Sequence, residues 1–373
     1  MKIFVSAGEA SGDLHASELM KALSAAHGDI NFTFLGGDLM EHAASTPPLI
    51  HYRHMAYMGF SEVIRHLPDI AANLRTARRA LLAERPDAVV LVDYPGFNLK
   101  LAKTAWKAGI PVYWYISPKV WAWKEYRLPK LRRYVRRMLC ILPFEREYFR
   151  SKGMEVTYVG NPSVEEIDRR LASATPVEEL LRNHGIDTSR PLLTLVPGSR
   201  MGEIRNNLPV MDAVARRHPG LTAVIAGAPG IAPEVYASFS SYPVVSGATS
   251  SLMAGAVAAL VTSGTATLEC ALAGTPQVVC YRANGSRLSY NIMKRILHIP
   301  FVSLPNLIAG REVIPEMLVH LCTPDLVDAR LTDILPGAPG REKQIAGYSL
   351  IRERLGHRSA AVTAAETILK DFK

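Results

Sequence analysis

Polar residues after an apolar run in the second half of the chain have the spacing of an anion-binding turn. The run Val257–Val261 predicts a buried strand, followed by Ser263, Gly264 and Thr265 and then by a predicted helix. A turn of this kind at the start of a helix presents free backbone N–H groups to an anion. Glu269, within the helix, could accept hydrogen bonds from a ribose. The pattern suits a nucleotide diphosphate, although an ordinary turn between a strand and a helix has the same appearance.

A second turn in this half offers a positive charge. Ser199 and Arg200 follow the predicted strand Leu192–Val196 and precede a helix expected to start near Glu203. An arginine there would place a fixed cation beside a diphosphate, and a surface salt bridge is the alternative. Asn306 also follows a predicted strand, and we expect it to line the same nucleotide site.

The first half supplies carboxylates instead. Asp93 ends the apolar run Ala88–Val92, where a carboxylate is placed to act as a general base toward a hydroxyl group. The structural alternative is that Asp93 caps its own turn. A second carboxylate, Glu9, follows the first predicted strand, and we group it with Asp93 as a candidate catalytic residue.

The turn around Glu9 is rich in small residues. Gly8 and Gly12 allow a tight turn and a close approach of the backbone to a ligand, so we expect them, with Ser11, to contact the acceptor or an anion. Ser11 or Asp13 could instead cap the helix that follows, and capping is the role that we expect for Asp13.

Two further stretches carry aromatic or apolar residues beside cations. Residues 117–124 combine two tryptophans with two lysines, which suits sugar or acyl-phosphate contacts as well as ordinary packing. An amphipathic stretch near residues 55–83 carries several arginines. Such a stripe usually faces a core, but a basic amphipathic helix can also lie on an anionic bilayer. The expected membrane contacts are Phe60, Val63, Ile64 and Leu67.

These residues must be positioned by alternating strands and helices. Continuous apolar strands that alternate with helices indicate parallel sheets covered on both faces. We therefore predict an α/β protein with two Rossmann-like domains facing a central cleft, where ligands bind at the carboxyl ends of the strands. We place the first domain at residues 1–165 and the second at 166–349. A C-terminal helix at about 350–373 is expected to pack back on the first domain or on a partner subunit.

Composition narrows the class of protein. The formal net charge of +9 includes clusters of arginines, which favour anionic partners. The four cysteines stand apart, so no metal site or disulfide framework is expected, and no apolar run reaches the ~18 residues of a membrane span. The absence of GxxxxGK[ST] and of a strict GxGxxG argues against a P-loop ATPase and a standard NAD site.

The motifs together resemble the lipid-A-disaccharide synthase family of GT-B type glycosyltransferases. The resemblance runs from Ser6 to about Glu312, with the motifs in the family's order. They are Ala7–Asp13, Asp93–Asn98, Ser117–Trp123, Pro197–Arg200, Ser263–Glu269 and Ser303–Leu307. Any one of these is weak, but the set is specific. Many members carry a second aspartate where this chain has Gly96, which leaves the role of that position open.

The resemblance implies an inverting reaction between UDP-2,3-diacylglucosamine and 2,3-diacylglucosamine 1-phosphate (lipid X). The products would be UDP and a β-1,6-linked tetraacyl disaccharide 1-phosphate. It implies Asp93 as the base, with Arg200 and the N–H groups of Gly264 and Thr265 stabilising the departing UDP. It also implies no metal or other cofactor, no nucleic-acid partner, a peripheral place on the cytoplasmic face of the inner membrane, and homodimers formed through C-terminal segments.

Two rival interpretations remain at this point. A UDP-N-acetylglucosamine 2-epimerase or a peptidoglycan glycosyltransferase would share the fold and the nucleotide site. A non-catalytic lipid- or nucleic-acid-binding protein would account for the charge of +9 but not for the nucleotide-type turns.

Overall fold

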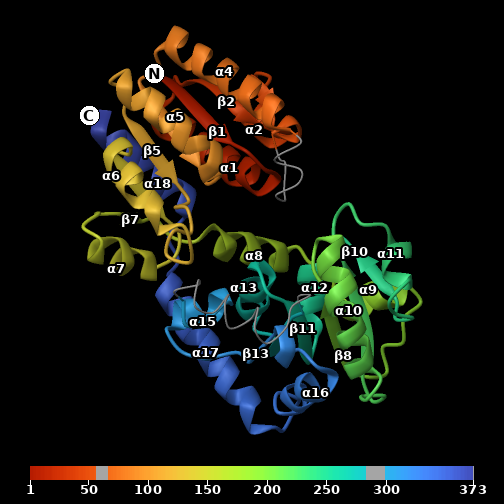
Figure 1. Cartoon of the computed structure of the whole chain (residues 1–373). Helices are drawn as coiled ribbons and strands as arrows, with labels where there is room; N and C mark the ends of the chain where they lie inside the picture. Colours follow the sequence, from red (N-terminus) through yellow and green to blue (C-terminus); the bar gives the residue numbers. More distant parts are fainter. Residues whose placement is uncertain (56–65, 283–298, 373) are drawn as a thin grey trace. The chain divides into compact units, whose positions relative to one another are not determined.

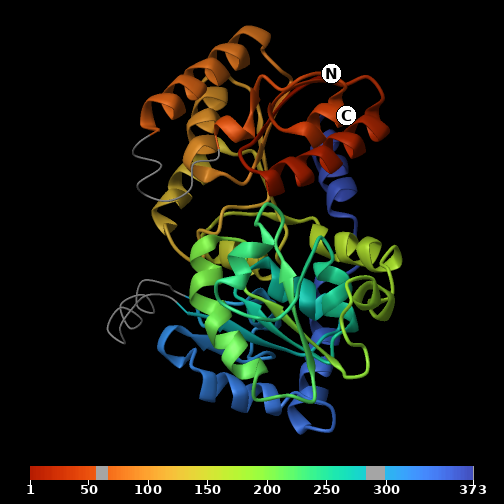
Figure 2. The same ribbon diagram turned by 90° about the vertical axis from the view of Figure 1, so that its right-hand side faces the viewer.

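The computed structural model describes residues 1–55, 66–282 and 299–372. The chain divides into two compact units. Unit 1 comprises Met1–Pro162 together with His357–Lys373, and unit 2 comprises Ser163–Gly356. Each unit contains one parallel sheet with helices on both faces (Figures 1 and 2). The prediction of an α/β protein with two parallel-sheet domains is therefore confirmed.

The sheet of unit 1 has the strand order β3-β2-β1-β4-β5-β6-β7, and all of its strand pairs are parallel. Its strands are β1 (Lys2–Ala7), β2 (Asn31–Gly36), β3 (Ile50–His51), β4 (Ala88–Val92), β5 (Val112–Tyr115), β6 (Arg137–Cys140) and β7 (Thr157–Tyr158). The strand β4 is buried along its whole length, as expected for a parallel strand covered on both faces.

Alternate side chains of these strands enter two separate cores. Val89 and Leu91 face a core built with helices α4 (Leu67–Glu84), α5 (Pro95–Lys107), α6 (Leu128–Tyr134) and α7 (Phe144–Ser151). Val90 and Val92 face the opposite core, built with α1 (Ala10–His27), α2 (Asp38–Ala44) and α18 (Ala360–Leu369). This two-residue alternation places the α4, α5 and α6 layer on one face of the sheet.

The sheet of unit 2 repeats the scheme with the order β10-β9-β8-β11-β12-β13, again entirely parallel. Its strands are β8 (Leu192–Val196), β9 (Thr222–Gly227), β10 (Val244–Ser246), β11 (Ala258–Thr262), β12 (Gln277–Tyr281) and β13 (Glu316–Leu318). Its described helices are α8 (Pro162–Ala172), α9 (Val177–Asn183), α10 (Met201–Ala215), α11 (Pro233–Ala237), α12 (Thr249–Gly255), α13 (Thr265–Leu272), α15 (Leu304–Ala309), α16 (Pro324–Thr332) and α17 (Pro339–Leu355).

Both sheets reverse their strand order at one position. In unit 1 the chain starts at β1 and later returns to the other side of it with β4, and in unit 2 β8 and β11 have the same relation. Ligands of open α/β sheets bind beyond the carboxyl ends of the strands at such a reversal. These two strand pairs are therefore where the predicted site residues must be sought.

The C-terminal tail consists of two helices. The helix α17 ends at Leu355 and is followed by Gly356, whose φ of 67° lies in the left-handed region that glycine adopts readily. The helix α18 then packs its residues Ala364 and Ile368 into the core that it shares with α1 (Figure 1). The single helix expected at about 350–373 is thus interrupted at a glycine. None of the described helices is long and apolar enough to cross a membrane.

Candidate functional site

Asp93 stands directly after β4, in a backbone conformation that is rarely adopted by residues other than glycine. Asp93 and Tyr94 have φ values of 40° and 46°, and α5 begins at the next residue, Pro95. Two bonds hold this turn: the Asn98 side-chain amide donates to the carbonyl of Asp93 at 2.8 Å, and the Tyr94 hydroxyl donates to the carbonyl of Met55 at 2.7 Å. Strained backbone of this kind persists only where the surroundings fix it, and it is concentrated at functional sites.

The environment of Asp93 tunes its acidity. Burial, and to a smaller extent the negative charge of Glu9, raise the pKa of this carboxyl to about 6, while Lys119 and Arg127 act in the opposite direction. A carboxylate with a pKa close to neutral pH can accept a proton from a hydroxyl group and release it again. This supports the predicted general base over a purely structural cap.

Glu9 lies on the neighbouring strand end, as predicted. It is the residue that precedes α1, its carboxylate accepts a hydrogen bond from the Ser11 hydroxyl at 2.7 Å, and its charge acts on Asp93. A Cβ atom on Gly8 would lie 2.3 Å from the ring of Tyr94, so the turns after β1 and β4 are in direct contact. A Cβ atom on Gly12 would be 3.3 Å from that of Ala7. Packing accounts for both glycines, and their contact with an acceptor stays a prediction.

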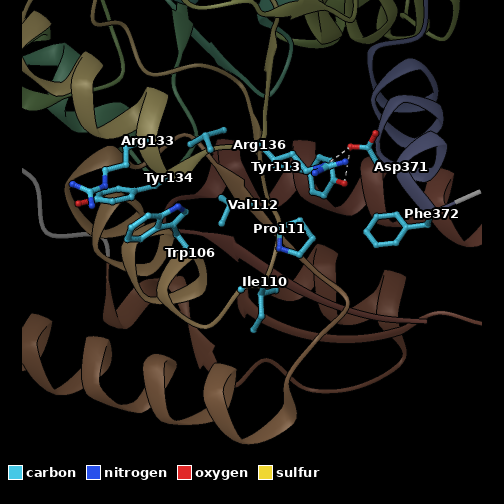
Figure 3. Close-up of a pocket in the computed structure, with 12 residues that line it drawn as sticks. Trp106, Ile110, Pro111, Val112, Tyr113, Arg133, Tyr134, Arg136, Asp371 and Phe372 are labelled. Carbon is cyan, nitrogen blue, oxygen red and sulfur yellow. Dashed lines mark hydrogen bonds and ion pairs between the residues drawn. The ribbon is translucent and has the colours of Figure 1, made fainter.

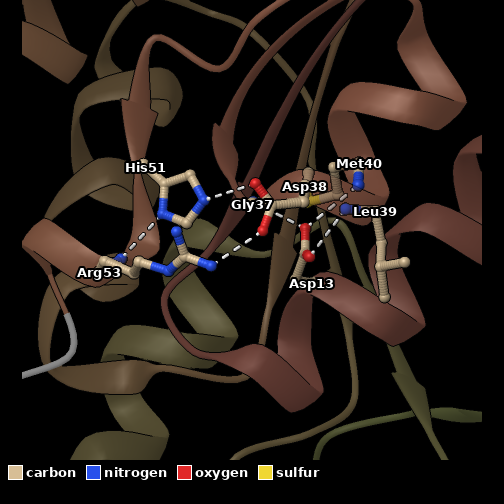
Figure 4. Close-up of polar contacts among 7 residues, drawn as sticks. All are labelled: Asp13, Gly37, Asp38, Leu39, Met40, His51 and Arg53. Carbon is tan, nitrogen blue, oxygen red and sulfur yellow. Dashed lines mark hydrogen bonds and ion pairs between the residues drawn. The ribbon is translucent and has the colours of Figure 1, made fainter.

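Asp13 caps a helix, but not its own. Its buried carboxylate accepts backbone N–H bonds from Gly37 at 2.7 Å, Leu39 at 3.1 Å and Met40 at 3.2 Å (Figure 4). These groups form the N-terminus of α2, whose free N–H groups need an acceptor and whose dipole favours a negative charge. The prediction that Asp13 caps the helix following its own turn is therefore wrong. The residue instead joins α1 to α2.

A buried glutamate that the sequence analysis missed holds the loop after β5. Glu145, 1% exposed, accepts hydrogen bonds from the Ser117 hydroxyl at 2.5 Å, the Trp121 indole at 2.9 Å and the Leu142 backbone N–H at 3.0 Å. Burial raises its pKa to about 7, and these bonds oppose the rise. The loop carries Lys119, one of the cations that act on Asp93. Glu145 follows no recognisable motif, so only the fold identifies it.

In unit 2 the predicted anion-binding turn joins β11 to α13. Gly264 precedes the first residue of α13, Thr265, and both are exposed. The carbonyl of Gly264 accepts bonds from the backbone N–H and the hydroxyl of Thr267, at 3.2 and 2.8 Å. Ser263, partly buried, ends the strand side of the turn. The first N–H groups of α13 are thus presented at the β8–β11 reversal, as an anion site requires.

The turn after β8 is organised by Glu203. Its carboxylate accepts the backbone N–H of Ser199 at 3.0 Å and pairs with Arg200 at 3.4 Å. Gly198 has a φ of 121°, and a Cβ there would lie 2.5 Å from this carboxylate. The Arg200 side chain remains 66% exposed. The surface ion pair is thus present, and a contact of Arg200 with a diphosphate stays a prediction.

Glu269 occupies the second turn of α13. Burial raises its pKa, Arg170 lowers it, and Glu166 raises it. Arg170 is itself paired with Glu166 on α8. Glu269 is therefore partly buried in unit 2, beside the charged side chains of Glu166 and Arg170, and its contact with a ribose stays a prediction.

Asn306 differs from the rest of the predicted donor set. It is completely buried, and its amide nitrogen donates to the carbonyl of Ile314 and to Glu316, both at 2.9 Å. Its amide oxygen accepts the N–H groups of Val313 at 2.7 Å and of Ile314 at 3.0 Å. Because protein groups occupy both ends of the amide, we correct the predicted ligand contact to a structural role in holding the segment before β13.

The predicted membrane contacts fall at the start of α4 and before it. Phe60, Val63 and Ile64 lie outside the described residues, whereas Leu67, the first residue of α4, is 53% exposed. Further along the predicted stripe, Leu74 belongs to the core. Across residues 1–55, 66–282 and 299–372, no group of His, Cys, Asp and Glu is arranged to hold a metal ion.

Comparison with known proteins gives consistent matches over the whole chain. The family model for lipid-A-disaccharide synthetase matches residues 3–371. The lipid-A-disaccharide synthase of Myxococcus xanthus is 41% identical over 99% of this chain and 97% of its own length.

Among solved structures, a UDP-GlcNAc 2-epimerase from Neisseria meningitidis, bound to UDP-GlcNAc, has a TM-score of 0.61 at 13% identity. It covers 100% of this chain and 99% of its own. The kitacinnamycin glycotransferase also has a TM-score of 0.61, at 14% identity and with the same coverage. At these identities the two structures support the fold alone.

Proposed function

This chain belongs to the lipid-A-disaccharide synthase family, UDP-sugar-dependent glycosyltransferases that join UDP-2,3-diacylglucosamine to lipid X, and we propose how its two sheet edges divide that reaction. Asp93, at the carboxyl ends of β1 and β4 in unit 1, accepts the proton of the acceptor hydroxyl. The carboxyl ends of β8 and β11 in unit 2 hold the UDP part of the donor. The observation that carries this proposal is the carboxyl of Asp93, with a pKa of about 6 in a fixed turn after β4.

The chemical step is a single displacement. The 6-hydroxyl oxygen of lipid X attacks C1 of the donor sugar as the bond from C1 to the UDP oxygen breaks. The hydroxyl proton passes to Asp93, and the bonding electron pair leaves with UDP. Attack opposite to the leaving group inverts C1 and gives the β-1,6 linkage. Glu9 assists because its negative charge favours the protonated form of Asp93.

The leaving group becomes more negative as its bond breaks. In this proposal Arg200 and the N–H groups of Gly264 and Thr265 stabilise that charge, and their position after β8 and β11 at the strand reversal supports this role. Ser199 and Ser263 add hydrogen-bonding groups beside them, and Glu269 is the proposed ribose contact. No metal or other cofactor enters this scheme, in which the fixed cation and the helix N-terminus have the charge-stabilising role.

Three further features extend the proposal. The acceptor contacts the turn of Gly8, Ser11 and Gly12 after β1. The protein binds its diacylated substrates at the anionic inner face of the cytoplasmic membrane, with Phe60, Val63, Ile64 and Leu67 as membrane contacts.

The protein forms a homodimer through its C-terminal segments. The passage of the chain from unit 2 back to unit 1 at Gly356 supports this, because α18 could complete unit 1 of either copy. Light scattering of the purified protein measures the state of association.

Incubation with UDP-2,3-diacylglucosamine and lipid X, followed by mass spectrometry, tests the function. The expected product is the tetraacyl disaccharide 1-phosphate, with release of UDP. A parallel incubation with UDP-N-acetylglucosamine tests the epimerase alternative, which shares the fold. Formation of epimerised sugar without disaccharide would contradict the proposal. Donors without acyl chains that react as fast as the diacylated donor would contradict it as well.

A further inference from the structure

The positive charge of this chain is concentrated in one segment. Residues 100–137 contain eleven Lys and Arg residues and a single acidic residue, Glu125. The whole chain contains 43 basic and 34 acidic residues. This segment therefore accounts for the entire net charge of +9, and the rest of the chain is close to neutral.

The fold displays that charge on one outer face of unit 1. The helices α5 and α6 are neighbours in the same layer, and α6 turns Leu128 and Leu131 into the core. Lys130 and Arg133, three residues apart on α6, lie on the opposite side and are exposed. Tyr126, in the 3-10 turn Glu125–Arg127 just before α6, is exposed as well. The only acid of the segment, Glu125, is paired with Lys152 at 2.5 Å. The exposed side of α6 is thus cationic.

Large aromatic side chains accompany these cations. Lys124 lies 3.6 Å from the ring centre of Trp123, and Arg133 lies 4.7 Å from that of Trp106. Trp106, Trp123 and Tyr126 are 40%, 52% and 68% exposed. Exposed Trp and Tyr rings beside Lys and Arg suit the boundary between lipid headgroups and acyl chains, where a ring has both apolar and polar surroundings.

A surface cavity of about 600 Å³ continues this face (Figure 3). Trp106, Arg133 and Tyr134 line one part of it, and Phe372, 39% exposed, lies at the other. Asp371 is the acidic residue of the lining, and it is paired with Arg136 and Arg137. The cavity therefore presents cations and aromatic rings without an unpaired acid among its lining residues.

We propose that this α5–α6 face, defined by Trp106, Trp123, Tyr126, Lys130 and Arg133, is the surface of unit 1 that docks on an anionic phospholipid bilayer. The inference rests on the proposed membrane association and adds a second surface to the Phe60–Leu67 contact. The charge of the face is complementary to anionic headgroups, and the diacylated substrates are lipids themselves. The face begins at the 117–124 loop, whose Lys119 acts on Asp93, so docking brings the catalytic edge to the lipid.

Quenching of tryptophan fluorescence by brominated lipids detects this contact directly in the unmodified protein. Of the four tryptophans, Trp114 and Trp121 are buried, whereas Trp106 and Trp123 are exposed on the proposed face. Vesicles of phosphatidylglycerol and phosphatidylcholine with brominated acyl chains should quench the emission of these two residues. Trp123→Phe should remove part of the quenched component. Vesicle binding without any quenching would overturn the proposal.

Cosedimentation with the same vesicles without bromine separates this inference from the membrane proposal. The triple variant Tyr126→Ser, Lys130→Gln, Arg133→Gln should bind at least about 25-fold more weakly, since each basic residue near an anionic surface contributes about fivefold. The matched control is Leu326→Ser, Arg330→Gln, Lys343→Gln, which removes the same charge from exposed positions of unit 2 and should bind normally.

Each outcome has a distinct meaning. If the wild-type protein fails to bind anionic vesicles, membrane association itself is wrong. If it binds and the α5–α6 variant binds equally well, the contact lies elsewhere and only this inference fails. If the α5–α6 variant loses binding to a labelled oligonucleotide but still binds vesicles, the face is a nucleic-acid site and the docking proposal is overturned. Unchanged UDP affinity and unfolding temperature show that the variant is folded.

Discussion

The strand reversals of the two units have the same topology and opposite chemistry. In unit 1 the residues after β1 and β4 are carboxylates, Glu9 and Asp93. In unit 2 the residues after β8 and β11 are an arginine, hydroxyl groups and the free N–H groups of a helix. The fold thus supplies two equivalent positions, and the residue types decide that one can take up a proton while the other can hold an anion.

The two edges also differ in how they expose their groups. Asp93 is partly buried, in a turn held by the Asn98 amide, and this burial is the main cause of its raised pKa. Arg200 is 66% exposed, and Gly264 and Thr265 are exposed as well. A base needs a desolvated environment to reach a neutral pKa, whereas an anion site needs accessible donors.

Replacing the base should have the largest effect. Asp93→Asn keeps the size of the side chain but cannot accept the proton, so turnover should fall by a factor of about 100 to 10,000. Initial rates of disaccharide formation measure this, and calorimetric UDP affinity should stay at the wild-type value. Near-normal turnover would remove Asp93 from the chemical step, and lost UDP affinity would mean that the two edges do not divide the reaction.

Removing the cation of unit 2 should act on binding instead. Arg200→Ala loses a charge-assisted contact worth about 1.5–3 kcal/mol, so the Kd for UDP should rise about 10- to 150-fold. Arg205→Ala, an exposed arginine of the same helix, is the matched control and should leave the Kd unchanged. Equal affinity of both variants would place the diphosphate elsewhere.

Truncating Asn306 should reduce stability rather than contact with UDP. Asn306→Ala leaves the buried N–H group of Ile314 and the partly buried N–H group of Val313 without their acceptor, which should cost roughly 1–3 kcal/mol in the free energy of unfolding. Denaturant titration measures this change. If stability is unchanged while UDP binding is lost, the corrected structural role is wrong and the original donor contact is restored.

The smallest expected effect is a shift in pH dependence. Asp93 must be deprotonated to act, so kcat/KM should fall as the pH drops through about 6. Glu9 raises the pKa of Asp93, so Glu9→Gln should move this limb to lower pH. Lys119 lowers the same pKa, so Lys119→Met should move it to higher pH. Shifts of the two variants in the same direction would contradict the assignment of either charge.

Much of the fold follows from local sequence. The continuous apolar runs at 88–92, 192–196 and 258–261 are β4, β8 and β11, because a strand covered on both faces needs apolar residues at every position. The two-residue strand β3 and the three-residue strand β13 lack such runs and were missed. Their pairing is decided by neighbouring strands, which the local pattern does not reveal.

The apolar runs and the polar residues that follow them are enough to identify the side chains at the strand ends, and therefore Glu9, Asp93 and Arg200 as candidates for chemistry. The roles of the buried polar groups depend instead on the tertiary structure. Asp13 caps α2 rather than its own helix, Asn306 binds backbone groups near β13, and Glu145 holds the loop after β5. The reason is physical: a buried polar group must find partners, and these partners come from elements that only the fold brings within hydrogen-bonding distance.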